Sequence, residues 1–244
     1  MKGAVAVVVP VHRNASTLEA LVGRLAAALD RRDWQVLLVV DASPDDSAMV
    51  AAALATADPR VRVRVLERNV GQHRALALGL AACADAQAWV CLDADLQDPP
   101  EAVPALLDRL ADGDVDAVFA GRRGAYEGRL RLLTGRAHRA ALARLTGLPA
   151  DAGAFLALGP PARDAVLSAQ APSLVAAIGA ARLPVASVPV RRDLRPQGES
   201  SWTALARVRQ SARTLAWALR AGSRSGTVRP VAGPRQESRV RDRS

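Results

Sequence analysis

The sequence has few aromatic residues, a single lysine and two cysteines. Four tryptophans, two phenylalanines and one tyrosine among 244 residues provide little surface for stacking nucleic-acid bases. No recognised nucleic-acid-binding motif accompanies them, so we do not expect nucleic acid as a partner. Cys83 falls in a helical pattern and Cys91 in an apolar run. Both are therefore expected to be small core residues in a reducing compartment.

Long apolar runs and two familiar nucleotide motifs are also missing. No stretch approaches the roughly 18 to 20 apolar residues of a membrane-spanning helix, and Ala4–Val9 is too short for the core of a signal peptide. We therefore expect a cytoplasmic protein without a membrane span. Neither G-x-G-x-x-G after the first strand nor G-x-x-x-x-G-K-[ST] occurs. These absences disfavour a dinucleotide dehydrogenase and a P-loop NTPase.

Charge is divided sharply along the chain, which carries a net +9. Residues 1–119 contain 11 basic and 17 acidic side chains, whereas residues 120–244 contain 22 and 7. Lys2 is the only lysine, so the excess is arginine. A basic half of this kind indicates a phosphate-bearing partner, such as an anionic lipid or a phosphorylated substrate.

Strand and helix patterns alternate over the first half of the chain, which predicts an α/β fold with a mostly parallel sheet covered by helices on both faces. The strands are expected at 4–9, 35–40, 61–65, 88–92 and 115–120, and the helices at 17–29, 45–57, 71–84 and 102–110. In such a sheet, ligands bind beyond the carboxyl ends of the strands. Polar loops follow four of these strands, at 10–14, 41–45, 69–73 and 93–97.

The loop Asp93-Ala94-Asp95-Leu96-Gln97 is the most informative of the four. Residues i and i+2 at a strand end point the same way, so Asp93 and Asp95 can share a cation. Mg²⁺ and Mn²⁺ prefer oxygen ligands and keep positions for phosphate oxygens. An acidic, solvated loop is the alternative, but the neighbouring polar loops favour a metal site formed by Asp93, Asp95 and Gln97.

Six motifs in register give the chain a resemblance to family 2 glycosyltransferases of the GT-A fold, and within them to polyprenyl-phosphate sugar transferases. The motifs are Pro10-Val11-His12, Val40-Asp41-Ala42-Ser43-Pro44-Asp45 (resembling D-D-G-S-x-D), Arg68-Asn69-Val70-Gly71-Gln72-His73, the D-A-D-L-Q loop with Pro99-Pro100-Glu101, Asp151-Ala152-Gly153-Ala154-Phe155, and Arg195-Pro196-Gln197-Gly198-Glu199-Ser200-Ser201-Trp202. Departures from the family pattern are His12, Arg13, Asn14, Val40, Ala157 and Ser201.

The resemblance implies an inverting, metal-dependent transfer of a sugar from a nucleotide-diphosphate sugar to a polyprenyl phosphate by an enzyme of the hexosyltransferase class. It assigns Asp93, Asp95 and Arg195 to catalysis, with Mg or Mn as cofactor. Nucleotide binding falls to Pro10, His12, Asn14, Asp41 and Gln72. Contacts to the acceptor or diphosphate fall to Arg123, Arg136, Asp151, Gly198 and Ser200.

The second half supplies the expected membrane contact. Arginines crowd residues 120–146, where leucines recur at roughly helical spacing, a pattern typical of a basic amphipathic helix at a lipid interface. The alternative is an ordinary surface helix that packs on the sheet and exposes its basic face to solvent. The expected organisation is a GT-A domain at 1–202, a basic amphipathic helix at 203–221 and a disordered tail at 222–244. This organisation predicts a peripheral protein at the inner face of the membrane.

Three alternatives remain open at this point. A related glycosyltransferase could act on a soluble or polysaccharide hydroxyl, which requires a carboxylate base such as Asp151. A degenerate, non-catalytic transferase and a nucleic-acid-binding protein are the other two.

Overall fold

The computed structural model describes residues 4–123, 147–169, 171–192, 212–214, 216–217 and 219–220. Its strands are β1 (Val5–Val11), β2 (Trp34–Asp41), β3 (Val61–Leu66), β4 (Ala88–Cys91), β5 (Ala117–Arg123), β6 (Leu156–Leu158) and β7 (Val185–Arg191). Its helices are α1 (Leu18–Ala28), α2 (Ser47–Ala57), α3 (Gln72–Ala82), the 3-10 turn η1 (Pro100–Ala102), α4 (Val103–Ala111), α6 (Pro160–Ser168) and α7 (Leu174–Ala181). The nine elements predicted over residues 4–120 are confirmed to within three residues.

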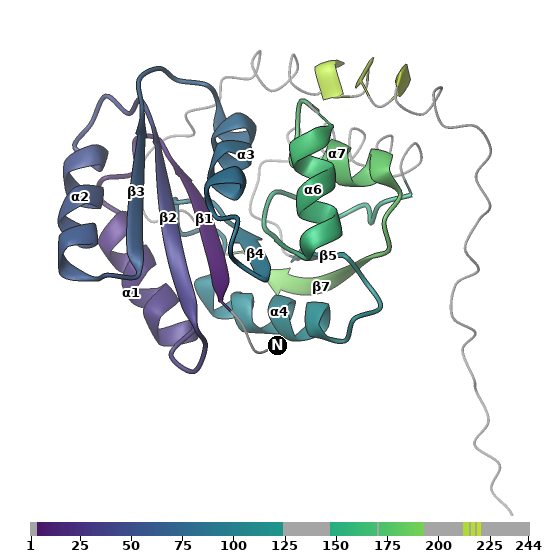
Figure 1. Cartoon of the computed structure of the whole chain (residues 1–244), viewed down its shortest axis with the longest axis horizontal. Helices are drawn as coiled ribbons and strands as arrows, with labels where there is room; N and C mark the ends of the chain where they lie inside the picture. Colours follow the sequence, from purple (N-terminus) through teal and green to yellow (C-terminus); the bar gives the residue numbers. More distant parts are fainter. Residues whose placement is uncertain are drawn as a thin grey trace, which may run out of the picture.

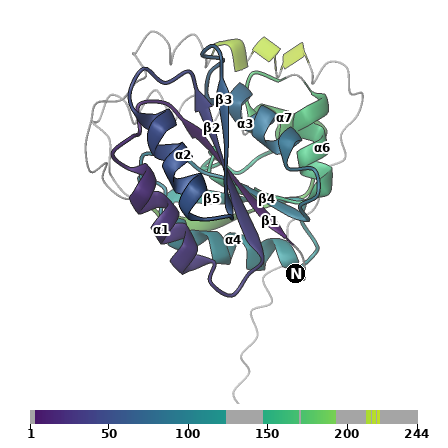
Figure 2. The ribbon, with the colours of Figure 1, turned by 60° about the vertical axis from the view of Figure 1, so that its left-hand side comes forward.

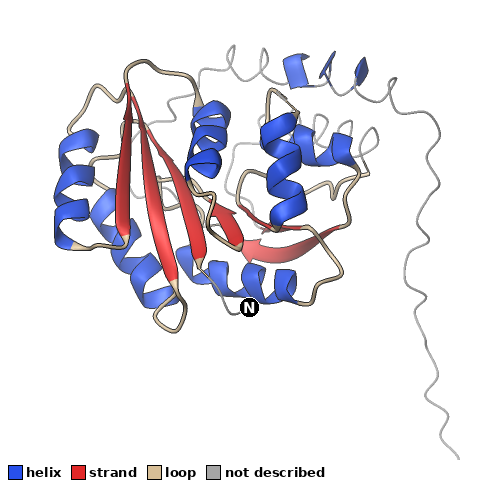
Figure 3. Ribbon diagram, in the orientation of Figure 1, coloured by secondary structure: helices blue, strands red, loops and turns tan. Residues whose placement is uncertain are grey.

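The strands form one sheet in the order β3-β2-β1-β4-β6-β5-β7. Every neighbouring pair is parallel except those involving β6, which runs antiparallel to both β4 and β5. The predicted mostly parallel sheet is therefore correct, and β6 is its antiparallel insertion. Figure 3 shows the strands as a twisted layer between two sets of helices.

Each face of the sheet has its own hydrophobic core because side chains alternate along a strand. Val5, Val7 and Val9 of β1 pack with residues of α1 and α4 on one face. Ala6 and Val8 pack with α3, α6 and α7 on the other. Figures 1 and 2 show these helices on opposite sides of the sheet. The fold is thus a three-layer α/β/α sandwich.

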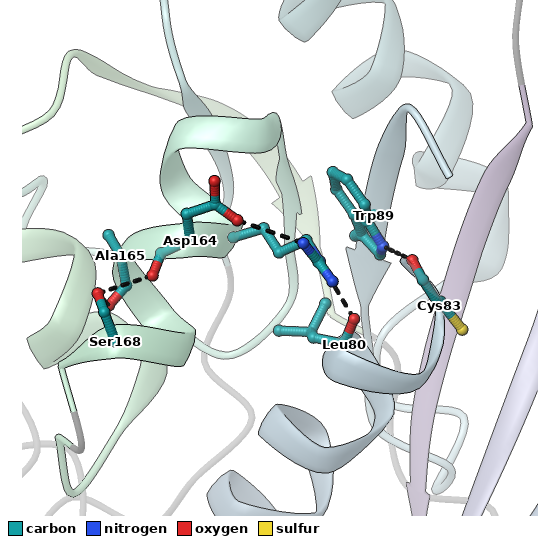
Figure 4. Close-up of polar contacts among 7 residues, drawn as sticks. Leu80, Cys83, Trp89, Asp164, Ala165 and Ser168 are labelled. Atoms are coloured by element: carbon teal, nitrogen blue, oxygen red, sulfur yellow. Dashed lines mark hydrogen bonds and ion pairs between the residues drawn. The ribbon is translucent and has the colours of Figure 1, made fainter. Parts of the chain in front are cut away.

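The C-terminal end of α3 is held by side chains from outside the helix. Trp89 of β4 donates a 2.7 Å hydrogen bond from Nε1 to the carbonyl oxygen of Cys83, and Arg163 of α6 donates from Nε to that of Leu80 (Figure 4). The Arg163 guanidinium also lies over the Trp89 ring, 4.8 Å from its centroid. These contacts satisfy carbonyl groups that a helix end leaves without intrahelical partners. Helix α3 is therefore fixed against both β4 and α6.

Several residues described beyond β7 are helical, namely 212–214, 216–217 and 219–220. Thr214 is buried and Trp217 packs against the core on the α3, α6 and α7 side, whereas Leu219 is 57% exposed. They fall inside the amphipathic helix predicted at 203–221, whose other residues and the tail at 222–244 lie outside the described residues. No helix in the described part of the chain is long and apolar enough to cross a membrane.

Candidate active site

Three loops that follow β1, β2 and β4 meet at one edge of the sheet. They do so because β1 pairs in parallel with both β2 and β4, so that their carboxyl ends lie side by side. A fourth loop, between β3 and α3, reaches the same edge through its contacts with Asp41. The structure therefore brings together the four polar loops that the sequence analysis selected.

Asp41 connects the end of β2 to the beginning of α3. Its buried carboxylate accepts hydrogen bonds from the backbone N–H groups of Val70 at 2.7 Å and Gly71 at 2.8 Å. These two N–H groups immediately precede α3, whose N-terminal end favours a nearby negative charge through the helix dipole. Gly71 has a φ of 85°, a conformation that glycine adopts without steric cost. Asp41 thus sets the position of the first turn of α3.

The β1–α1 loop is held against the β2–α2 loop. The Arg13 N–H donates to Ser43 Oγ at 2.7 Å, and the Ala15 N–H donates to Asp45 Oδ2 at 3.2 Å. Partial burial would raise the pKa of Asp45, but hydrogen bonds from the Ser43 and Ser47 hydroxyls and from two backbone N–H groups lower it to about 2. Asp45 is therefore ionised throughout the neutral range and acts as a fixed acceptor for the neighbouring loop.

Non-glycine residues with positive φ recur in these loops. Arg13 has a φ of 59°, Ala42 of 45° and Leu96 of 59°. Such conformations cost of order 1 to 3 kcal/mol each and persist only when surrounding contacts impose them. One follows each of β1, β2 and β4, so this edge of the sheet carries backbone strain in all three loops.

The side chains of His12 and Asn69 form a polar pair beside the carbonyl group of Asp41. His12 Nδ1 lies 3.1 Å from the Asp41 carbonyl oxygen, and Asn69 Nδ2 lies 3.2 Å from both that oxygen and His12 Nδ1. Asn14 accepts at 3.2 Å from the His12 N–H through its side-chain oxygen. The imidazole is thus fixed where the loops after β1 and β2 meet, and Pro10, within β1, is half-buried.

The D-A-D-L-Q loop alternates between open and buried positions as the sequence predicts. Asp93, Asp95 and Gln97 are half-buried, whereas Ala94 and Leu96 are buried. Thr17 Oγ1 donates to the Ala94 carbonyl oxygen at 2.7 Å, and the Gln97 N–H donates to Asp95 Oδ1 at 3.1 Å. The loop is therefore held with its two carboxylates on the more accessible side.

Two side chains from other elements contact Asp93. Gln72, the first residue of α3, donates from Nε2 to Asp93 Oδ1 at 2.5 Å. A nitrogen of the Arg192 guanidinium lies 3.6 Å from Asp93 Oδ2, and Arg192 Nε donates to Asp98 Oδ1 at 2.8 Å. The Arg192 and Asp98 side chains are only 8% and 3% exposed. Burial would lower the pKa of Arg192, but the charges of Asp98, Asp93 and Asp95 outweigh it and raise the pKa.

The fit of a divalent cation to this loop depends on charge as well as ligand number. Among the described residues, no group of three or more His, Cys, Asp or Glu side chains is placed to hold a metal. Two carboxylates and an amide oxygen are nevertheless enough for an ion that completes its coordination with substrate phosphates. Asp93, Asp95 and Asp98 contribute three negative charges against one from Arg192. The excess of two negative charges suits a divalent cation.

His73 follows Gln72 at the start of α3. Its Nδ1 atom is buried and has no hydrogen-bond partner among the described residues. Burial lowers the pKa of His73 to about 4. The imidazole is therefore neutral at physiological pH.

Asp151 lies at the same edge of the sheet, in the loop that precedes β6. Its two carboxylate oxygens are 3.1 and 3.2 Å from Ser187 Oγ of β7, which donates to them. A Cβ atom at Gly121 of β5 would overlap both Asp151 Oδ2 and Ser187 Oγ. The carboxylate thus occupies space that only a glycine leaves open.

Other predicted site residues have no described side chain. Arg123 is the last residue of β5, but only its backbone is described. Arg136, Arg195, Gly198 and Ser200 lie outside the described residues, so their assignments stay predictions.

Sequence reasoning missed Arg192, Asp98 and Ser187. Asp98 stands inside the D-A-D-L-Q-x-P-P-E motif at its variable position, and Arg192 stands three residues before Arg195. A basic residue directly after a strand was the available signal for Arg192, but β7 had not been predicted. Ser187 gave no signal, because a serine within a strand is ordinary.

Known proteins share both the sequence motifs and the fold. The sequence profile described as glycosyl transferase family 2 matches residues 6–151. An undecaprenyl-phosphate 4-deoxy-4-formamido-L-arabinose transferase of Sodalis glossinidius is 38% identical over 146 residues, which cover 59% of this chain and 44% of that protein. Its counterpart in Pectobacterium carotovorum is 34% identical over 156 residues, covering 62% and 47%. The chain thus spans less than half the length of these curated relatives.

Solved structures with low sequence identity have the same fold. A mannosyltransferase from Pyrobaculum calidifontis, in complex with GDP-Man and Mn²⁺, superposes with a TM-score of 0.65 at 19% identity, covering 94% of this chain and 67% of that one. A glucosyl-3-phosphoglycerate synthase from Mycobacterium tuberculosis, in complex with Mn²⁺, UDP-glucose and phosphoglyceric acid, gives 0.68 at 22% identity, covering 91% and 80%. The fold is therefore GT-A. With the profile matching more than half of its residues, this chain belongs to glycosyltransferase family 2.

Proposed function

We propose that this chain transfers a sugar from a nucleotide-diphosphate sugar to a polyprenyl phosphate, with inversion at the anomeric carbon and with Mg²⁺ or Mn²⁺ as cofactor. The main support is the D-A-D-L-Q loop, because its two half-buried carboxylates lie at the edge of the sheet where the loops after β1 and β2 begin. The relatives named for transfer to undecaprenyl phosphate support this acceptor class.

The donor side follows from the charge that develops during the reaction. Breaking the sugar–phosphate bond leaves negative charge on the departing diphosphate. A bound divalent cation neutralises such charge, and Asp93, Asp95 and Gln97 would hold it. Arg195, with the Gly198 and Ser200 segment, is proposed to contact the same diphosphate, because an arginine fork matches phosphate oxygens.

The nucleoside would lie over the loops after β1 and β2, beside Pro10, His12 and Asn14. Asp41 and Gln72 are proposed to support nucleotide binding by positioning other groups and not by contacting the nucleotide. Asp41 fixes the start of α3, and Gln72 holds Asp93. Changing either residue should therefore move the cation ligands as well as the nucleoside site.

A phosphate acceptor needs little help from a base. The second pKa of a phosphate monoester is about 6, so the acceptor arrives mostly ionised at neutral pH. Arg123 and Arg136 are proposed to bind it. We place the reaction at the cytoplasmic face of a membrane through peripheral contact, and the exposed Arg213, Leu219 and Arg220 near the C-terminal end of the described chain suit such a surface.

Transfer to a hydroxyl acceptor is the second candidate, and Asp151 is the observation that favours it. The Asp151 carboxylate is half-buried near the carboxyl end of β5 and is held by Ser187. A hydroxyl acceptor requires such a base, whereas an ionised phosphate does not. Asp151→Asn should therefore abolish hydroxyl transfer but leave phosphate transfer largely intact.

The test combines ligand binding with turnover. A panel of UDP, GDP and TDP sugars is titrated with Mn²⁺ by thermal shift, and transfer to a short-chain prenyl phosphate is followed with the donor that binds. Asp95→Ala should lose the Mn²⁺-dependent shift. Asp85→Ala is the matched control, because exposed Asp85 precedes β4 at the opposite edge of the sheet. Transfer to hydroxyl acceptors alone, with prenyl phosphate inert across the panel, would contradict the proposed acceptor.

A further inference from the structure

A buried arginine in contact with a carboxylate of the D-A-D-L-Q loop is the least expected feature of the site. Arg192 follows β7, at the far edge of the sheet order, yet its guanidinium reaches Asp93 at the end of β4. Its side chain is 8% exposed and is anchored at 2.8 Å by Asp98, a residue 94 positions earlier in the chain. A buried ion pair of this kind persists only with close contacts to its partners, so Arg192 is a fixed charge.

The same carboxylate is needed by a cation and by Arg192. Asp93 Oδ1 accepts a hydrogen bond from Gln72, and Asp93 Oδ2 faces the guanidinium of Arg192. A divalent ion that binds Asp93 must therefore share or displace these contacts. It must also sit near a positive charge, and like charges a few ångströms apart repel strongly in a partly buried site. Arg192 opposes a cation both through its occupation of Asp93 and through its charge.

Asp98 keeps Arg192 in this position. One Asp98 oxygen accepts from Arg192 Nε, while the other is buried without a hydrogen-bond partner among the described residues. Loss of the guanidinium would leave the Asp98 carboxylate buried without a counter-charge, which is strongly unfavourable. The arginine cannot easily leave when a cation arrives.

We propose that Arg192 is a positioning residue that competes with the divalent cation for Asp93 and keeps the cation weakly bound until a nucleoside diphosphate arrives. The inference rests on the proposed function and adds to it. Diphosphate oxygens bring the negative charge that lets a cation and the guanidinium occupy neighbouring positions. Binding of cation and nucleotide is then coupled, and the coupling is reciprocal.

The test measures Mn²⁺ binding by the full chain without nucleotide, from the free Mn²⁺ signal in electron paramagnetic resonance. Arg192→Gln should bind Mn²⁺ at least about tenfold more tightly than the parent, because one opposing charge is removed from the site. Arg192→Lys keeps a positive charge beside Asp98, but a single ammonium does not serve Asp93 and Asp98 together, so its Mn²⁺ affinity should lie between those of the parent and Arg192→Gln. Arg191→Gln is the matched control, because exposed Arg191 is the neighbouring residue in the chain, and it should leave the affinity unchanged.

A second variant addresses folding. Arg192→Gln leaves Asp98 buried without its counter-charge, so Arg192→Gln/Asp98→Asn provides a neutral pair of similar shape. It keeps the excess of two negative charges but frees Asp93 Oδ2 from the guanidinium, so it should also bind Mn²⁺ more tightly than the parent, although less tightly than Arg192→Gln. Adding UDP or GDP should tighten Mn²⁺ binding more in the parent than in Arg192→Gln or in Arg192→Gln/Asp98→Asn.

Two outcomes separate this inference from the proposed function. Asp95→Ala should abolish Mn²⁺ binding in every background. If Asp95→Ala does so but Arg192→Gln and Arg192→Gln/Asp98→Asn both bind Mn²⁺ no more tightly than the parent, competition by Arg192 is refuted while the cation site stands. If Asp95→Ala binds Mn²⁺ as the parent does, the cation site and this inference are both refuted.

Discussion

Acidification should weaken the fold through His73, the residue that follows Gln72 at the start of α3. Its imidazole has a pKa of about 4 in the folded chain because burial disfavours the charged form, against an ordinary value of 6.5. Between these two values the unfolded chain binds a proton that the folded chain does not. Stability therefore rises with pH across this window. It is fully present above pH 6.5 and is lost progressively as the pH falls towards 4.

The size of the effect follows from the same two values. At about 1.4 kcal/mol for each pKa unit, the full difference corresponds to about 3 kcal/mol. The His73 side chain is half-buried, and solvent near the ring reduces the penalty. We therefore expect a loss of about 2 kcal/mol between pH 6.5 and 4, which is a large part of the 5 to 15 kcal/mol typical of a domain.

Urea unfolding at a series of pH values measures this loss. The free energy of unfolding of the parent is compared with that of His73→Gln, which has no proton to bind. The difference between parent and His73→Gln should change by about 2 kcal/mol over the window. Equal pH dependence in the parent and His73→Gln would refute the reasoning.

Two further predictions concern the backbone that supports the site. Gly79→Ala should destabilise the chain by roughly 1 to 2 kcal/mol in urea unfolding, because its Cβ would overlap a valine of β1 and overpacking outweighs the gain in helix propensity. Gly23→Ala on α1 meets nothing within 4 Å and should instead stabilise by about 0.5 to 1 kcal/mol; equal effects would contradict the packing argument. Ala42→Gly should stabilise by up to about 1 kcal/mol, because it relieves a φ of 45°. A clear loss of thermal stability in Ala42→Gly would show that the loop is not strained.

The sequence was sufficient for the first half of the fold because that half is built from local patterns. Val5 to Val11 is an uninterrupted apolar strand buried on both faces, and the Leu18, Leu21, Val22 and Leu25 stripe marks α1 directly. The order of the later strands depends instead on long-range pairing. β6 has three residues and inserts antiparallel between β4 and β5. Neither its length nor its apolar sequence reveals that direction.

The candidate site divides in the same way. His12, Asn14, Asp41, Gln72 and Asp93 could be predicted to share one edge, because each follows a strand or begins a helix there. Their individual contacts could not be predicted. The roles of Asp41 and Gln72 shown here depend on which backbone N–H or carboxylate they reach, and such contacts depend on the relative placement of β2, α3 and β4.

Arg192 shows what a motif leaves undetermined about a cation site. The D-x-D spacing specifies two oxygen ligands, but the affinity of those ligands depends on every charge within a few ångströms. Arg192 extends one nitrogen towards Asp93 and another to Asp98, which suits a planar fork and not the single ammonium of lysine. The only lysine of the chain is Lys2. The basic side chain beside Asp93 and Asp98 is an arginine, which can contact both carboxylates together. Two family members with the same D-x-D motif should therefore differ in cation affinity wherever the residue after β7 differs in charge.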